Sequence, residues 1–147
     1  ITNQMRRMVR SSINNPLNSY LLRLILANDL RPMPLAVWTW ARNGFRYQQE
    51  WPHVVANLPQ MLRVPVGDCN DFAIVTAALG IAGRVPVRWA LGYDARGTPR
   101  HVWTQYYFGG EWLDVDPTPG APPPGGGSPV DVPGVQIVGY DITPVEA

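Results

Sequence analysis

The sequence predicts an α+β domain in which helices come first along the chain and antiparallel strands follow. Two observations indicate this class. Apolar residues recur at helical spacing early in the chain, and a further helix beginning near Cys69 opens onto strand-like segments. A Gly109-Gly110 pair separates two of those segments, as in a tight β-hairpin. We expect the helices to pack on the antiparallel sheet.

The helices are expected before residue 80. The clearest covers residues 17–28, where apolar side chains recur along one face and Asn15-Pro16 supplies a start. A shorter helix is expected over residues 2–11. Another is expected over residues 35–43, because prolines break the chain just before it and Gly44 is a natural stop. A further helix is expected to run from Cys69 to Gly80.

The remaining segments are read from residue preferences. Two prolines limit regular structure over residues 45–62. Residues 117–133 are dominated by Pro and Gly, which indicates a surface loop or linker. A C-terminal extension over residues 134–147 has one expected strand at 135–142. The other expected strands follow the Cys69 helix and cover residues 85–93, 101–108 and 111–115.

Length and charge restrict the classes of function. The chain has 147 residues, so we expect a single domain over residues 1–147 with one hydrophobic core. Twelve Lys and Arg residues balance eleven Asp and Glu residues, without the basic stripe of a nucleic-acid surface. The longest apolar stretch, residues 21–27, contains Arg23 and is too short to span a bilayer. We expect neither a nucleic-acid partner nor a membrane partner.

Cys69 is the only cysteine, so the chain forms no intrachain disulfide and no multi-thiolate zinc site. A lone cysteine is often just a small buried apolar residue. Here it begins a predicted helix with Asp68 as the N-cap, and the helix dipole there stabilises a thiolate. Free amides at the helix start would also help to bind an oxyanion. Asp71 is expected to hydrogen-bond the nearby backbone.

A reactive thiol needs a base, and the chain has two histidines. His53 lies between prolines and is expected to be an exposed polar residue. His101 opens one strand of the predicted hairpin and Asp116 follows the other, so hairpin pairing brings them side by side. The carboxylate can then orient the imidazole. Asp114 lies on the same face, two residues earlier, and competes for this role.

The chain also has six tryptophans. Trp103 and Trp112 lie on adjacent predicted strands, where they either line a substrate cleft or, as is more common for such pairs, pack in the core. The other four are expected to be packing residues: Trp38, Trp40, Trp51 and Trp89.

Three strings of residues resemble the motifs of the transglutaminase-like superfamily. Gly-Asp-Cys-Asn-Asp-Phe-Ala at 67–73 is similar to its nucleophile motif, and His-Val-Trp at 101–103 to its histidine strand. Trp-Leu-Asp-Val-Asp-Pro-Thr at 112–118 is similar to its aspartate strand. The similarity extends upstream, as in bacterial and phage-encoded members, and covers about residues 35–118. In this pattern the aspartate directly precedes Pro-Thr, which favours Asp116 over Asp114.

The resemblance implies a papain-like fold with a catalytic triad of Cys69, His101 and Asp116. Cys69 would attack an acyl carbon, His101 would act as general base and then acid, and Asp116 would hold the imidazole tautomer. We therefore expect a cysteine-dependent hydrolase of peptide, isopeptide or amide bonds, working through an acyl thioester, with transamidation as a second outcome. The resemblance implies a protein or peptide substrate and no cofactor or metal.

Two alternatives come from other classes. One is a catalytically silent protein-interaction module that retains the fold, and the other is a self-associating structural subunit. The intact Cys69, His101 and Asp116 favour the enzyme. Because phage-encoded members have a similar motif, we expect a virion-associated location. A cytoplasmic location is the alternative. The sequence leaves the oligomeric state open.

Overall fold

The computed structural model describes residues 2–13, 15–48, 57–126 and 136–145. The helices are α1 (Thr2–Ile13), α2 (Pro16–Asn28), α3 (Met33–Gly44), α4 (Leu58–Arg63) and α5 (Cys69–Ala82). The strands are β1 (Arg46–Tyr47), β2 (Val66–Gly67), β3 (Val87–Tyr93), β4 (Pro99–Phe108), β5 (Glu111–Val115) and β6 (Gly139–Pro144).

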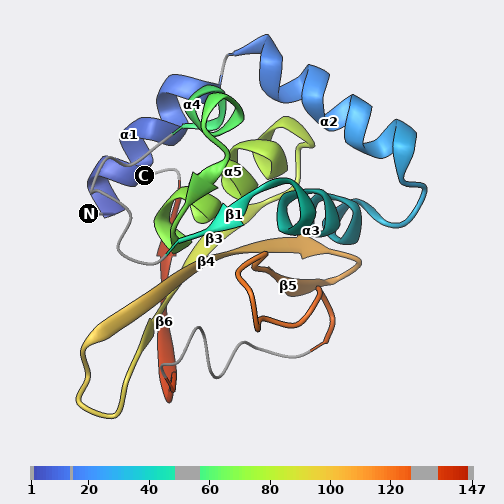
Figure 1. Ribbon diagram of the computed structural model, residues 1–147. Helices are drawn as coiled ribbons and strands as arrows, with labels where there is room; N and C mark the ends of the chain where they lie inside the picture. Colours follow the sequence, from blue (N-terminus) through green and yellow to red (C-terminus); the bar gives the residue numbers. More distant parts are fainter. Residues whose placement is uncertain (1, 14, 49–56, 127–135, 146–147) are drawn as a thin grey trace.

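The main sheet has four antiparallel strands in the order β5-β4-β3-β6. Its helical cover lies on one side, with α5 against the sheet (Figure 1). The β4–β5 connection is Gly109-Gly110, and both glycines have positive φ, at 64° and 87°. This is the conformation that a two-residue hairpin loop favours. A separate parallel pair joins β1 to β2, just before α5 begins.

Helix α5 is the centre of the fold because it is buried nearly all round, from Asp71 to Gly80. A helix without a polar face needs cover on every side. Residues from α1 and the sheet cover one side of it, including Met5, Val9, Trp89 and Val102. Residues from α2, α3 and α4 cover the other side, including Leu22, Ile25, Val37 and Met61.

Buried polar contacts fix α5 against β4. The Thr104 hydroxyl donates to the Ala73 carbonyl at 2.9 Å and lies 2.7 Å from the Thr76 hydroxyl. The phenol of Tyr106 donates to the Thr76 carbonyl. A Cβ atom on Gly80 would lie 2.6 Å from the Tyr106 ring, so glycine allows this close approach of helix and strand. The same helix begins at Cys69 and the same strand carries His101.

Most expected elements are present, and the bounds of one strand were wrong. The strand expected over residues 135–142 is instead Gly139–Pro144, because these residues form the ladder with β3. The preceding Ile137 packs on Trp103 and Ala90. Two prolines were expected to limit regular structure over residues 45–62, and the described residues of this segment contain two short elements, β1 and most of α4.

Helix α4 forms although the segment contains a proline. Pro59 lies in its first turn, where the missing amide hydrogen costs little. The Asn57 side chain accepts a hydrogen bond from the Gln60 amide at 3.0 Å, and the Gln60 side chain accepts one from the Asn57 amide at 2.8 Å. This reciprocal cap starts the helix. The Pro/Gly-rich loop is described from residue 117 to residue 126, where it has no helix or strand.

Candidate active site

The N-terminus of α5 is fixed by a reciprocal cap around Cys69. The Asp68 carboxylate accepts hydrogen bonds from the amides of Asn70 and Asp71, at 3.0 and 3.4 Å. The Asp71 carboxylate accepts one from the Asp68 amide, at 3.0 Å. Both aspartates therefore have the backbone roles that the sequence predicted. Cys69 is the first residue of the helix, partly exposed, at the positive end of the helix dipole.

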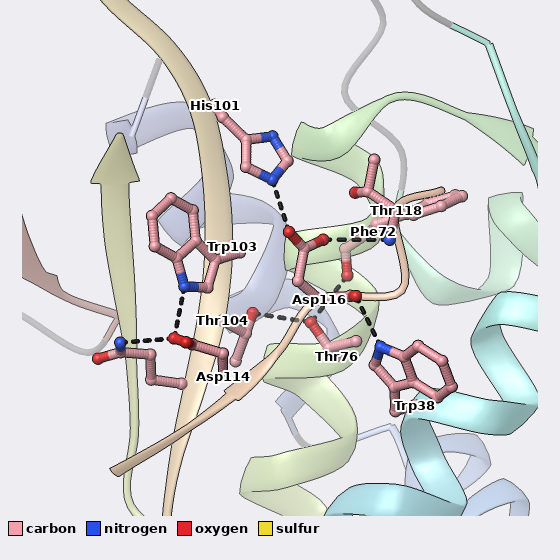
Figure 2. A network of polar contacts seen from close by, with 10 residues as sticks. Trp38, Phe72, Thr76, His101, Trp103, Thr104, Asp114, Asp116 and Thr118 are labelled. Atoms are coloured by element: carbon pink, nitrogen blue, oxygen red, sulfur yellow. Dashed lines mark hydrogen bonds and ion pairs between the residues drawn. The ribbon is translucent and has the colours of Figure 1, made fainter. Parts of the chain in front are cut away.

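The hairpin brings His101 and Asp116 together. In its register Thr104 pairs with Val115, so Asp116 follows the last paired residue of β5 and lies near the start of β4. His101 Nε2 and Asp116 Oδ2 are 2.6 Å apart, and the two residues are only 4% and 2% exposed (Figure 2).

Two further hydrogen bonds hold Asp116. The Thr118 amide donates to its other carboxylate oxygen at 3.1 Å, so both carboxylate oxygens have partners. The Trp38 indole donates to its backbone carbonyl at 2.7 Å, across from α3 (Figure 2). Trp38 was expected only to pack, but it also fixes the position from which the carboxylate reaches His101.

The imidazole of His101 interacts with the side chains of Asp116 and Cys69. Burial by itself lowers the pKa of His101, because it disfavours the charged ring. The Asp116 carboxylate and the Cys69 side chain, both hydrogen-bond partners of the ring, overcome this effect and raise the pKa to about 10. The structure thus brings the three predicted residues together, with His101 between the other two.

Asp114 has different partners. Its Oδ1 atom accepts hydrogen bonds from the Trp103 indole at 2.7 Å and from the side-chain Nε2 of Gln105 at 2.8 Å. Asp116 is therefore the carboxylate that binds His101, and Asp114 binds the neighbouring side chains of β4.

The tryptophans differ in exposure. Trp103 is 1% exposed, which favours packing over a cleft wall. Trp112 is partly exposed and lies under the Arg88 guanidinium, 4.0 Å from the ring centre. Trp40 packs edge-on against Phe45, and Trp89 is fully buried. Two residues lie outside the described part of the chain: Trp51 and His53.

Sequence reasoning missed Tyr47. It pairs with Gly67 across the β1–β2 bridge, and its ring packs edge-on against Phe72 at 5.7 Å. Burial raises the pKa of the Tyr47 phenol, and the negative charges of Cys69, Asp68 and Asp116 raise it further. The phenol therefore lies near the candidate site and stays protonated at neutral pH. The β1–β2 bridge and the contact with Phe72 connect Tyr47 with the start of α5, and such a short bridge has no sequence periodicity.

The described residues also bear on two other classes of site. No group of three or more His, Cys, Asp or Glu side chains in this part of the chain is placed to hold a metal ion. None of its helices has both the length and the apolar character needed to cross a membrane.

The sequence matches a known family and the fold is similar to that of solved structures. The sequence matches the model of the transglutaminase-like superfamily over residues 26–117, more than half of the chain. None of the curated proteins compared with the sequence matches it. The fold is similar to that of a protein from Cytophaga hutchinsonii assigned as a cysteine protease. The TM-score is 0.58 and the identity 22%, with 84% of this chain and 42% of that chain covered.

A second solved structure, of a TGase, has a TM-score of 0.51 and 16% identity and covers 75% of this chain and 36% of that one. The chain thus spans less than half the length of either protein, and at these identities the two structures show a shared fold. The family match includes the residues that the fold brings together, from the start of α5 to Asp116. The chain therefore belongs to the transglutaminase-like superfamily.

Proposed function

We propose that the protein is a cysteine-dependent hydrolase of peptide, isopeptide or amide bonds, with Cys69, His101 and Asp116 as its triad. The observation that carries this proposal is the buried His101, which lies 2.6 Å from Asp116 and has the Cys69 side chain as its other partner. A base held by a carboxylate and facing a thiol at a helix N-terminus is the arrangement that activates a cysteine. The substrate is a protein or peptide, and the reaction needs no cofactor.

The first step follows from the histidine geometry. Nε2 of His101 is bound to Asp116, so Nδ1 is the ring nitrogen left to exchange a proton with Cys69. Transfer of the thiol proton to Nδ1 gives a thiolate and an imidazolium. The Asp116 carboxylate stabilises that imidazolium, and the α5 dipole stabilises the thiolate. The thiolate sulfur then attacks the acyl carbon and forms a tetrahedral oxyanion.

The cap of α5 restricts which amides can bind this oxyanion. The Asp68 carboxylate already occupies the amides of Asn70 and Asp71. Among the described residues, the Cys69 amide has no acceptor, so it is the donor left at the helix start. The protonated phenol of Tyr47 lies nearby and is our candidate for a second donor.

The rest of the reaction returns the enzyme to its starting state. The carbon–nitrogen bond breaks as Nδ1 of His101 gives its proton to the leaving amine, which leaves an acyl thioester on Cys69. Water then attacks the thioester, its proton passes to Nδ1, and the carbon–sulfur bond breaks to release the acid. An amine in place of water would give a new amide. The neighbours assigned as a cysteine protease and a TGase have names that fit either outcome.

A peptide mixture tests the proposal without a known substrate. A casein digest is incubated with the protein, with and without a primary amine, and analysed by mass spectrometry against Cys69→Ala. We expect cleaved or deamidated peptides that depend on Cys69, and amine adducts if transfer competes with hydrolysis. Unchanged peptides, together with a Cys69 thiol no more reactive than a free cysteine, would support the silent interaction module instead.

A further inference from the structure

The catalytic histidine of the proposed triad has an aromatic neighbour on its own strand. The rings of His101 and Trp103 are stacked, with centroids 5.4 Å apart and planes inclined by 24°. This is the offset arrangement that aromatic pairs prefer. The electron-rich face of an indole also attracts a cation, and tryptophan does so more strongly than the other aromatic side chains. Trp103 therefore stabilises the protonated ring of His101 relative to the neutral ring.

The indole has one polar atom, and Asp114 binds it. Nε1 of Trp103 donates to Oδ1 of Asp114 at 2.7 Å (Figure 2). This bond fixes the ring within its plane. A carboxylate acceptor also polarises the indole, which makes its face more electron-rich and strengthens its attraction to a cation.

Close packing holds the indole on its remaining sides. Tyr140 of β6 packs edge-on against it at 5.4 Å, and Ile137 and Ala90 share its buried cluster. A Cβ atom on Gly92, which pairs with His101, would lie 2.9 Å from Cζ3 of Trp103. A side chain at residue 92 would therefore force this ring or the neighbouring Ile137 to shift.

Several other ionisable groups of the described residues lie around the pair. His101 is bound directly by Asp116 and by Cys69 at the start of α5. From β1 the phenol of Tyr47 is close to those two groups, and from β6 the phenol of Tyr140 borders Trp103. From β3 the Arg88 guanidinium is separated from Asp114 by Gln105, which it binds at 2.7 Å.

We propose that Asp114 is a positioning residue, which holds Trp103 against His101 and thereby favours the imidazolium that pairs with the Cys69 thiolate. The benefit of this arrangement for catalysis rests on the proposed triad. The effect of Asp114 on the protonation of His101 does not. Asp114 and Asp116 then have separate roles: Asp116 binds the imidazole edge, and Asp114 acts on its face through the indole.

The direct test is the titration of His101 by NMR of histidine-labelled protein. The chain has two histidines, so His53 provides an internal reference in each spectrum. Every protein carries Cys69→Ala, so the result does not depend on whether Cys69 is a nucleophile. The variants added to it are Trp103→Phe, Asp114→Leu and Asp114→Asn, with Trp112→Phe as the control. Trp112 lies on the neighbouring strand, where it contacts Tyr107 and Arg88.

We expect Trp103→Phe and Asp114→Leu to lower the titration midpoint of His101 by roughly 0.4 to 1.5 pH units, the size of a cation–π contribution. Asp114→Asn keeps an acceptor for the indole and should lower the midpoint less. This variant tests the role of Asp114 if Asp114→Leu does not fold. Trp112→Phe should leave the midpoint unchanged. An unshifted midpoint in folded Trp103→Phe and Asp114→Asn, or an equal shift in Trp112→Phe, would overturn the proposal. A failed triad would show separately, as an unreactive thiol in the protein that retains Cys69.

Discussion

A Cβ atom on Gly67 would lie 2.7 Å from Oδ2 of Asp71, the oxygen that accepts a hydrogen bond from the Asp68 amide. The absence of a side chain at residue 67 therefore makes room for the cap that starts α5. Gly67→Ala should displace the Asp71 carboxylate and weaken this cap. We expect a loss of about 1–2 kcal/mol in the free energy of unfolding, measured by urea denaturation, together with slower alkylation of Cys69.

Gly44→Ala is the matched control for this variant. A Cβ atom at residue 44 would meet nothing within 4 Å, and Gly44 is the last residue of α3. Alanine should leave the stability there unchanged or slightly higher. If both variants lose the same stability, the account of the cap is wrong.

The hydroxyl contact between Thr76 and Thr104 should stabilise the folded protein and hold α5 in position against β4. Thr104→Val removes the hydroxyl that binds the Ala73 carbonyl at 2.9 Å without changing the side-chain shape much. We expect the free energy of unfolding to fall by about 1–3 kcal/mol, because buried polar groups lose a partner. Thr39→Val removes an exposed hydroxyl that accepts from Arg31, and it should change stability by no more than about 0.5 kcal/mol.

The pair formed by His101 and Asp116 should make stability depend on pH. The pKa of His101 rises from 6.5 to about 10 on folding, so between these values the folded chain keeps a proton that the unfolded chain has lost. The stabilisation is complete below pH 6.5 and is lost as the pH rises toward 10. Where the folded and unfolded states differ by one full proton on His101, the slope that this residue contributes approaches about −1.4 kcal/mol per pH unit.

This slope is measured by urea unfolding of Cys69→Ala, in which no thiol titrates. Cys69→Ala lacks one of the two groups that raise the pKa, so its slope reports the contribution of Asp116. Adding His101→Gln should remove most of the slope. Parallel stability curves for the two proteins would show that His101 does not gain a proton affinity on folding.

Tyr47→Phe tests the second oxyanion donor. The phenyl ring preserves the packing on Phe72 and removes only the hydroxyl. We expect kcat on a peptide substrate to fall roughly 10²-fold or more, as for the loss of an oxyanion donor, while the alkylation of Cys69 changes little. Tyr140→Phe, which removes a phenol beyond Trp103, is the control. An unchanged kcat for Tyr47→Phe would exclude its hydroxyl from the oxyanion site.

The parts of the site that depend on local pattern could be predicted from the sequence. Asp68 and Asp71 cap a helix within four consecutive residues. A hairpin with Gly109-Gly110 at its turn fixes the pairing that brings His101 near Asp116. In both cases the partners are set by helix geometry or by a two-residue turn, so short-range rules suffice.

Contacts between distant segments could not be predicted. Trp38 binds the backbone of Asp116 across 78 residues of sequence, and nothing in its own segment distinguishes it from a packing tryptophan. Strand periodicity placed Asp114 and Asp116 on one face but could not separate their roles, since these depend on the indole of Trp103. The C-terminal strand was displaced for a similar reason: its register is set by β3, not by its own apolar residues.

The most direct test of the account is the rate of iodoacetamide alkylation of Cys69 from about pH 4 to about pH 9, in the parent protein and in His101→Ala. Because Cys69 is the only cysteine, the rate reports this thiol alone. We predict that the parent thiol reacts with a midpoint well below the usual value of about 8.5 and that His101→Ala moves the midpoint back toward it. A midpoint near 8.5 in both proteins would contradict the Cys69–His101 ion pair and the enzyme built on it.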